Sequence, residues 1–156
     1  MAELSVEYIN PFLAAATSIM KSMCQLDVNI GKPYVKTTEF ENDSLVIMIG
    51  VTGEMRGQVM IAFSVDIACD IASKMIMTPV IELNELSMSA ISELGNIILG
   101  NAATILSTKG IGIDITPPTL SHGEVSFTNT FTKSLCVPMD FDGHTAHLFL
   151  ALRQEN

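Results

Sequence analysis

Apolar positions recur at two different spacings along the chain, and these spacings separate predicted helices from predicted strands. A helical period runs over Val6–Cys24, over the residues that follow Ser64, and over Glu85–Thr108. Shorter runs rich in β-branched and aromatic residues lie between and after these segments. We expect strands at Tyr34–Phe40, Leu45–Val51, Gln58–Phe63, Ile113–Ile115, Phe127–Val137 and Thr145–Leu152.

Capping residues mark where the second and third helices begin and end. Ser64 is a typical N-cap for the second helix. Asn84 or Ser87 is suited to cap the third helix, because a short polar side chain can accept a hydrogen bond from the free amides of the first turn. Lys109 supplies a cation at the end of that helix, and Gly110 tolerates the left-handed conformation that often closes one.

The two ends of this pattern resemble each other at an offset of 86 residues (93 − 7). The offset pairs Glu7 with Glu93, Asn10 with Asn96, Leu13 with Leu99, Ala16 with Ala102, Ile19 with Ile105, and Gly57 with Gly143. Both halves then follow the order helix, strand, strand, strand, with the second helix inserted between them. We therefore expect an α+β fold, with helices packed on one mixed or antiparallel sheet of about six strands and a pseudo-twofold relation between the halves.

Length and composition favour a single folded domain over residues 1–156. The chain is 48% hydrophobic and 16% charged, which is typical of globular proteins. Its formal net charge of −9 argues against nucleic acid or an anionic membrane surface as the partner. The first residues lack the features of a secretory signal, and no apolar run is long enough for a membrane span. We expect a cytoplasmic protein whose cysteines, Cys24, Cys69 and Cys136, are buried free thiols.

The predicted helix over Glu85–Thr108 has two different faces. At about 100° per residue, the core face consists of Ile91, Leu94, Ile98, Ala102 and Ile105. The opposite face carries a narrow stripe of small or polar residues: Ser89, Glu93, Asn96, Gly100, Ala103 and Ser107. A solvated face usually carries long charged side chains, and glycine, as at Gly95 and Gly100, costs about 1 kcal/mol relative to alanine inside a helix. The stripe therefore predicts a surface that another molecule approaches closely.

Glu93 and Asn96 are three positions apart on this stripe, so their side chains are neighbours. No Lys or Arg occurs between Lys74 and Lys109, whereas enzymes that act on phosphoryl groups normally supply cations. If Glu93 acts at a phosphoryl group, the positive charge must come from a partner protein. The carboxylate would then bind a partner lysine, and the Asn96 amide would hold the attacking water. Partner contacts are expected at Ser89, Gly100, Ala103 and Ser107.

The run from Ser89 to Asn96 resembles the phosphatase motif of the CheC/CheX/FliY family, and most of all that of its CheX branch. Ser89 and Asn96 flank Glu93 at the spacing of this motif, and the proline that follows it is present in Asp114–Pro118. The resemblance implies hydrolysis of the aspartyl phosphate on the response regulator CheY, with Asn96 positioning water and Glu93 pairing with a regulator lysine. It also implies that the regulator supplies Mg²⁺, that the chain has no cofactor of its own, and that it forms a homodimer.

A second copy of the motif occurs in the first half, at Glu7 and Asn10, with Pro33 further along. Glu3 stands where the motif has Asp or Ser, and Pro11 follows Asn10 directly. Asn-Pro is a common helix start, with the asparagine as the cap, and such a start would leave Glu7 outside the helix. If the helix instead starts earlier, Pro11 costs it a backbone hydrogen bond. We therefore interpret Glu7 and Asn10 as a relic of the duplication.

Other residues with chemical potential are interpreted as structural, and no metal site is predicted. His144 and His147 are three apart on a predicted strand, so they point to opposite faces and do not suit a shared metal ion. His122 sits beside a glycine in a predicted turn. Asp140 and Asp142 flank another turn, where aspartate is favoured for backbone reasons.

Two other function classes compete with the phosphatase. A binding module could dock on a response regulator or flagellar switch without turnover, and it would not need both Glu93 and Asn96. A hydrolase of small molecules acting through Glu93 is disfavoured, because a second carboxylate and local cations are missing.

Overall fold

A computed structural model describes residues 5–37, 40, 43–122 and 133–155 of the chain. The elements follow in the order α1 (Val6–Cys24), β1 (Asn29–Ile30), β2 (Tyr34–Thr37), β3 (Ser44–Gly53), β4 (Met55–Ser64), α2 (Val65–Ile76), α3 (Glu85–Thr108), β5 (Ile113–Ile115), β6 (Thr119–His122), β7 (Lys133–Phe141) and β8 (His144–Gln154). The described strands form one antiparallel sheet, in which β1-β7-β8-β4-β3-β5 are successive neighbours. In addition, β2 pairs with β7 and β6 pairs with β3.

The predicted α+β class and the predicted helices are confirmed, and each predicted strand has a counterpart in the sheet. The sheet has eight strands among the described residues, because the short strands β1 and β6 add to the six expected. Strands of two and four residues are too short to show a periodic pattern. Parts of two predicted strands, residues 38–39 and 127–132, lie outside the described residues.

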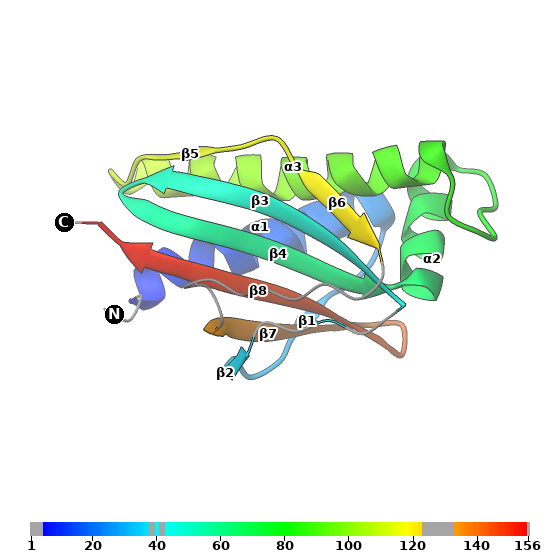
Figure 1. Ribbon diagram of the computed structural model, residues 1–156, viewed down its shortest axis with the longest axis horizontal. Helices are drawn as coiled ribbons and strands as arrows, with labels where there is room; N and C mark the ends of the chain where they lie inside the picture. Colours follow the sequence, from blue (N-terminus) through cyan, green and yellow to red (C-terminus); the bar gives the residue numbers. More distant parts are fainter. Residues whose placement is uncertain (1–4, 38–39, 41–42, 123–132, 156) are drawn as a thin grey trace.

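The internal repeat appears in the strand pairing. Strands β4 and β8 are neighbours at the centre of the sheet, and each belongs to a different half of the chain. The short strand β2 of the first half pairs with β7 of the second, while β6 of the second half pairs with β3 of the first. A shift of 86 residues (93 − 7) carries the β2 range onto the β6 range to within one residue. The halves are thus related by a pseudo-twofold, and their outer strands are exchanged (Figure 1).

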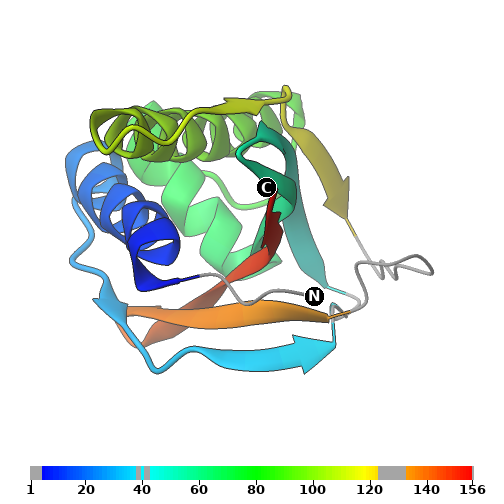
Figure 2. The same ribbon diagram turned by 90° about the vertical axis from the view of Figure 1, so that its left-hand side faces the viewer.

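All three helices lie on the same side of the sheet, which curves around them (Figure 2). The main core fills the space between these helices and the sheet, with Phe12, Ile47, Leu94 and Leu148 among its fully buried side chains. A second, smaller apolar cluster lies on the other face of the sheet and consists of Val46, Met60, Ala62, Cys136, Phe149 and Ala151. Each central strand therefore buries side chains on both faces, which is why its sequence lacks a strict polar–apolar alternation.

The cysteines are buried free thiols, as predicted. Burial raises the pKa of the Cys24 thiol to about 11, so this thiol is protonated and unreactive at neutral pH. Among the helices of the described residues, none combines the length and apolar character needed to cross a membrane.

Candidate functional site

Helix α3 is fixed at both ends by its own sequence. The Asn84 side chain accepts a hydrogen bond from the Ser87 amide at 2.8 Å, and the Ser87 hydroxyl accepts one from the Asn84 amide at 2.8 Å. This reciprocal capping box identifies Asn84, rather than Ser87, as the N-cap. At the other end Gly110 adopts the left-handed conformation (φ +78°), and the Ile111 amide reaches back to the Leu106 carbonyl. Fixed ends give side chains along α3 a defined orientation.

Close packing at Gly95 determines how near α3 lies to the sheet. Gly95 is buried, and a Cβ atom at this position would lie 2.8 Å from Cγ2 of Ile47 on β3. A side chain at Gly95 would therefore push the helix outward. In contrast, nothing lies within 4 Å of a Cβ atom at Gly100. The two helical glycines have different roles, and only Gly100 belongs to the outer surface.

The two faces of α3 are those that the sequence predicts. Ile91, Leu94, Ile98 and Ala102 are buried in the core, and Ile105 is half-buried against it. On the opposite side, Ser89, Glu93 and Ser107 are exposed, and Asn96, Gly100 and Ala103 are half-buried. The helix therefore presents Glu93 and Asn96 together on its outer surface, one turn apart.

An open groove of about 570 Å³ runs beside Glu93 and Asn96. One wall comes from the first half of α3 and includes Glu85, Met88, Ser89, Ser92, Glu93 and Asn96. The other wall comes from the chain leading into β6 and from β6 itself, with Pro118, Leu120, Ser121 and His122. Gly100, Ala103 and Ser107 continue the stripe along α3 beyond the groove. Figure 1 shows β6 running beside the first half of α3.

The polar groups of Glu93 and Asn96 are available to a partner. Within the described part of the chain, neither side chain takes part in a hydrogen bond or ion pair. The described residues that line the groove include two carboxylates, Glu85 and Glu93, and no Lys or Arg. An anionic group entering this groove would meet negative charge, unless it brought a cation with it.

Thr116 holds the far wall of the groove in place. Its amide donates to the Gly50 carbonyl at 2.9 Å, and its hydroxyl accepts from the Gly50 amide at 2.8 Å. The two bonds tie the chain just before Pro117-Pro118 to β3. Pro118, part of the proline pair on which the resemblance relied, therefore reaches the groove.

His122 is a groove residue that sequence reasoning missed. The sequence interpretation placed it in a turn, whereas it ends strand β6 and pairs with Leu45 of β3. Its side chain is exposed and lines the groove opposite α3. A local sequence signal could not reveal this position, because it depends on strand pairing between distant segments.

Of the two helix starts considered for the first-half copy, the structure has the earlier one. Helix α1 begins at Val6 with Ser5 as its N-cap, so Asn10 is not the cap and Pro11 lies inside the helix. Glu7 is therefore part of the helix, and Glu7 and Asn10 are exposed neighbours on its first turns. Pro11 is buried, and it lacks the amide that another residue at this position would use to continue the hydrogen bonds of the helix. Whether this pair is active is not tested by its position, and our interpretation as a relic stays a prediction.

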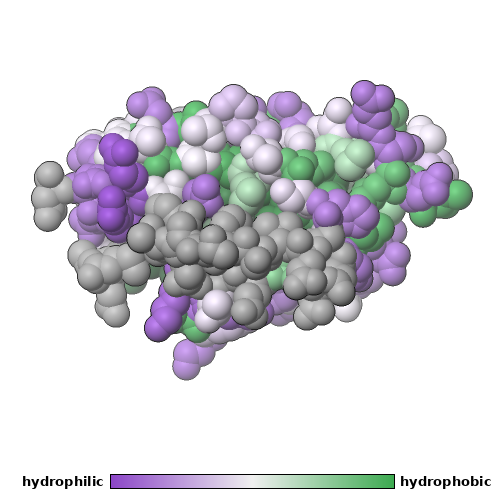
Figure 3. Space-filling model, in the orientation of Figure 1, coloured by the Kyte–Doolittle hydropathy of each residue, from purple (hydrophilic) through white to green (hydrophobic). Residues whose placement is uncertain are grey.

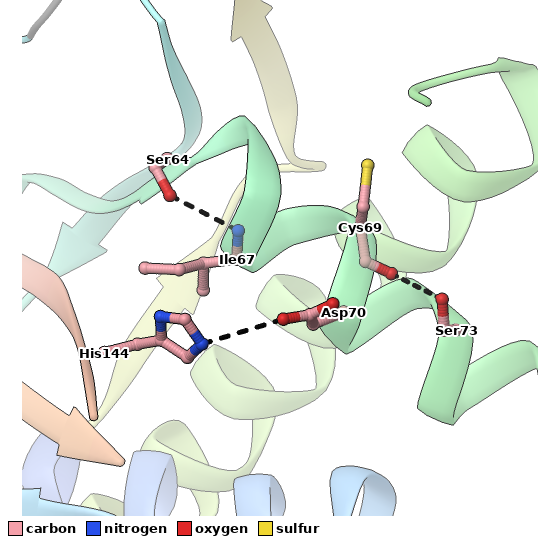
Figure 4. A network of polar contacts seen from close by, with 6 residues as sticks. All are labelled: Ser64, Ile67, Cys69, Asp70, Ser73 and His144. Carbon is pink, nitrogen blue, oxygen red and sulfur yellow. Dashed lines mark hydrogen bonds and ion pairs between the residues drawn. The ribbon is translucent and has the colours of Figure 1, made fainter. Parts of the chain in front are cut away.

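The other polar residues considered in the sequence make contacts within the fold. His144 faces the helices and lies 3.7 Å from Asp70 of α2 (Figure 4), whereas His147 lies on the other face, near the Phe149 ring. Asp142 and Gly143 both have positive φ in the two-residue turn between β7 and β8, as a tight hairpin turn requires. The Asp140 carboxylate accepts a hydrogen bond from Thr145. In the part of the chain that the structure describes, no three His, Cys, Asp or Glu side chains cluster to hold a metal ion.

Comparisons with known proteins identify the family to which the chain is related. The profile of the CheC-like family matches residues 86–122, which contain the α3 motif and the groove-lining residues other than Leu45 and Glu85. The CheY-P phosphatase CheX of Thermotoga maritima is 30% identical over 148 residues, covering 90% of this chain and 96% of its own. A crystal structure of the CheX-CheY-BeF3-Mg+2 complex from Borrelia burgdorferi matches with TM-score 0.79 and 30% identity, over 96% of this chain and 100% of that one. A CheC-like superfamily protein from Shewanella sp. PV-4 shares the fold with TM-score 0.84 at 24% identity, over 98% of this chain and 100% of that one.

Proposed function

The chain belongs to the CheC-like family, and we propose that it is a CheX-like phosphatase that removes the phosphoryl group from a CheY-type response regulator. In this proposal the regulator's phosphorylated cleft receives the outer face of α3, so that Glu93 and Asn96 reach the aspartyl phosphate. The observation that carries it is the pair of polar side chains, Glu93 and Asn96, one turn apart beside an open groove whose described lining residues include no Lys or Arg.

Asn96 is the residue that would act on water. Its amide oxygen can accept a hydrogen bond from a water molecule, and its NH₂ group can donate one to a phosphoryl oxygen. The water oxygen attacks phosphorus, the bond between phosphorus and the aspartyl oxygen breaks, and the carboxylate leaves. The water proton passes to the released phosphate. Orientation of one water in line with the breaking bond accounts for a large rate gain without an acid or base from this chain.

Glu93 would bind the partner rather than the phosphate. A carboxylate next to a phosphoryl group is repelled unless a cation lies between the two. A lysine of the regulator, placed beside its phosphorylated aspartate, would provide this cation and form a charge-assisted hydrogen bond with Glu93. Glu93 therefore contributes to affinity and to the position of α3 in the cleft, and through that position to turnover.

The metal ion would come with the regulator. The Borrelia burgdorferi complex contains Mg²⁺ together with CheY and BeF₃, and a regulator-bound Mg²⁺ would neutralise charge on the phosphoryl oxygens. Glu85 and Glu93 are the carboxylates among the described residues of the groove. We assign to this chain the orientation of water and the capture of a lysine, and to the partner the neutralisation of phosphate charge.

The decisive experiment follows phosphate release from CheY response regulators, including those of Thermotoga maritima and Borrelia burgdorferi. The wild-type protein should accelerate release. Asn96→Ala should lower the turnover number by about a hundredfold or more, while the protein remains folded and still binds the BeF₃-loaded regulator. Glu93→Gln, which keeps the shape and removes the charge, should weaken binding as well as turnover. Asn10→Ala is the matched control, because it removes the same amide at the repeat-related position and should leave turnover unchanged.

The outcomes of this experiment distinguish an enzyme from a binding module without turnover. Binding of the BeF₃-loaded regulator without any acceleration of phosphate release would support the binding module instead of the enzyme. Acceleration that survives both Asn96→Ala and Glu93→Gln would show that the site is elsewhere. Loss of activity in Asn10→Ala would contradict the interpretation of the first-half copy as a relic.

We also infer that two copies associate, as the resemblance implies, and that the protein acts in the cytoplasm, where its partner is. Strand β2 supports self-association: all four residues are exposed, and among the described strands it pairs with β7 alone. A free strand edge is a ready surface for another strand. Light scattering should give twice the mass of one chain, and a mass of one chain would contradict the dimer.

A further inference from the structure

The connection between α2 and α3 carries an unusual concentration of exposed apolar side chains. Among the described residues, the large hydrophobic side chains left exposed are Val6, Tyr34, Val35, Met77, Ile81 and Leu86. Three of them, Met77 (89% exposed), Ile81 (93%) and Leu86 (63%), fall within one short stretch of the chain. We call these three residues the connection patch. Figure 3 shows hydrophobic surface next to hydrophilic residues at this end of the molecule.

The backbone that carries the connection patch is anchored, so the exposure of these side chains is not a result of a loose loop. Ser73 of α2 is the anchor: its hydroxyl donates to the Cys69 carbonyl at 2.8 Å and accepts from the Val80 amide at 2.8 Å (Figure 4 shows the first bond). The Ser73 carbonyl also accepts from the amide of Met77 at 2.9 Å. The side chains of Val80 and Leu83 pack against the core. The chain thus turns some apolar side chains inward and leaves Met77 and Ile81 outward.

Leu86 connects this patch to the proposed catalytic surface. It precedes Glu93 by two helical turns on α3, at an angular separation of about 20° and a rise of about 10 Å. Leu86, Glu93 and Asn96 therefore lie on one continuous face of the same helix. A protein that covers Glu93 and Asn96 and extends over the start of α3 must also cover Leu86.

Charge near the patch specifies the chemistry of the surface that would cover it. Glu82 and Glu85 are exposed and adjoin the patch in sequence, and Glu85 also lines the groove. No Lys or Arg occurs between Lys74 and Lys109. The fitting partner surface is apolar with basic residues at its margin, and the same partner must present a cation to Glu93.

We propose that the connection patch is a second docking element for the phosphorylated response regulator, which contacts it with an apolar, base-flanked surface next to its phosphorylation cleft. This inference rests on the proposed function, because the regulator is the protein that covers Glu93 and Asn96. The patch supplies affinity and fixes the angle at which α3 enters the cleft, whereas Asn96 supplies the chemistry. The side chains of Ile81 and Leu86 lose little conformational entropy on binding, and the unbranched side chain of Met77 can adapt its shape to a partner surface.

The test separates affinity from turnover. In the triple variant Met77→Ser/Ile81→Ser/Leu86→Ser, the KM for the phosphorylated regulator should rise about tenfold or more, with kcat nearly unchanged. The Kd for the BeF₃-loaded regulator should rise by a similar factor. The variant should fold normally, because exposed positions contribute little to stability. Val6→Ser is the matched control: it removes an apolar side chain that is 66% exposed at the start of α1, outside the face of α3 that carries Leu86 and Glu93, and should leave KM unchanged.

Each outcome supports or overturns the inference. If the wild-type protein hydrolyses the phosphorylated regulator and the triple variant keeps its KM and Kd, the patch proposal is wrong while the proposed function stands. If the wild-type protein fails to accelerate hydrolysis and to bind the BeF₃-loaded regulator, both are wrong. If the triple substitution lowers the mass of the isolated protein in sedimentation equilibrium, the patch is an interface between copies of this chain, and the proposal is overturned.

Discussion

The two glycines of α3 should respond differently to substitution by alanine. A glycine in the middle of a helix is less favourable than alanine by about 1 kcal/mol. At Gly100 the new methyl group would meet no atom within 4 Å, so Gly100→Ala should raise the free energy of unfolding by about that amount. For a chain of this length the corresponding rise in Tm is about 2–4 °C.

At Gly95 the stabilisation that alanine gives to the helix is opposed by a steric clash. The new Cβ would lie 2.8 Å from Cγ2 and 3.1 Å from Cδ1 of Ile47, a side chain only 1% exposed. Cγ2 is bonded to Cβ, the side-chain atom closest to the backbone of β3. In a packed core it therefore cannot move aside unless the strand moves as well. Overpacking of this kind costs about 1–3 kcal/mol, and the helix gain leaves Gly95→Ala neutral to destabilising by about 2 kcal/mol.

A double-mutant cycle tests the assigned cause. Ile47→Leu conserves volume but removes the branch at Cβ, so it eliminates the 2.8 Å contact. Gly95→Ala should therefore be less destabilising in the Ile47→Leu background, with a coupling free energy of about 0.5–2 kcal/mol. Urea unfolding curves followed by circular dichroism give the four free energies of unfolding. Equal stabilisation by Gly95→Ala and Gly100→Ala, or no coupling between Gly95 and Ile47, would refute the account of how α3 sits on the sheet.

Three other features of the chain give predictions of their own. Gly100→Leu should keep or raise Tm but lower the rate of phosphate release from phosphorylated CheY by about tenfold or more, because a bulky side chain would obstruct a partner on the outer face of α3. An unchanged rate would show that the partner does not cover Gly100. Asn84→Ala should lower the free energy of unfolding by about 1 kcal/mol, because it deletes the capping box with Ser87, and differential scanning calorimetry would detect the loss. Burial lowers the pKa of His147 below its ordinary 6.5. As the pH falls through about 6.5, His147 therefore binds a proton in the unfolded chain before it does so in the folded chain, and the free energy of unfolding should decline. Urea titrations at several pH values should show a smaller decline in His147→Gln, and an identical decline in both proteins would contradict the assignment.

The sequence was sufficient for features that depend on local spacing. The period of α3 and its Gly110 end are encoded within the helix and its neighbours, whereas the sequence left the N-cap open between Asn84 and Ser87. The juxtaposition of Glu93 and Asn96 follows from a separation of three residues on one helix. Their outward orientation follows from the apolar residues on the other side.

Features that depend on distant contacts could not be predicted. Gly95 and Gly100 look alike in sequence, and only the approach of Ile47 on β3 distinguishes them. His122 becomes part of a groove wall through the pairing of β6 with β3, at Leu45. Local signals left two possible starts for the first helix, at Asn10 or earlier, and the structure shows the earlier one, with Pro11 buried inside α1.

The exchanged outer strands have a consequence for the origin of the fold. Since β2 completes the hairpin of the second half and β6 completes that of the first, an ancestral chain with only one half would have left a hairpin edge uncovered. Two such chains could cover these edges by binding each other, and the fraction of paired chains would depend on their concentration. Joining two such copies in one chain would replace that dependence with a fixed effective concentration, and it would allow one copy of the motif to diverge while the other kept the function.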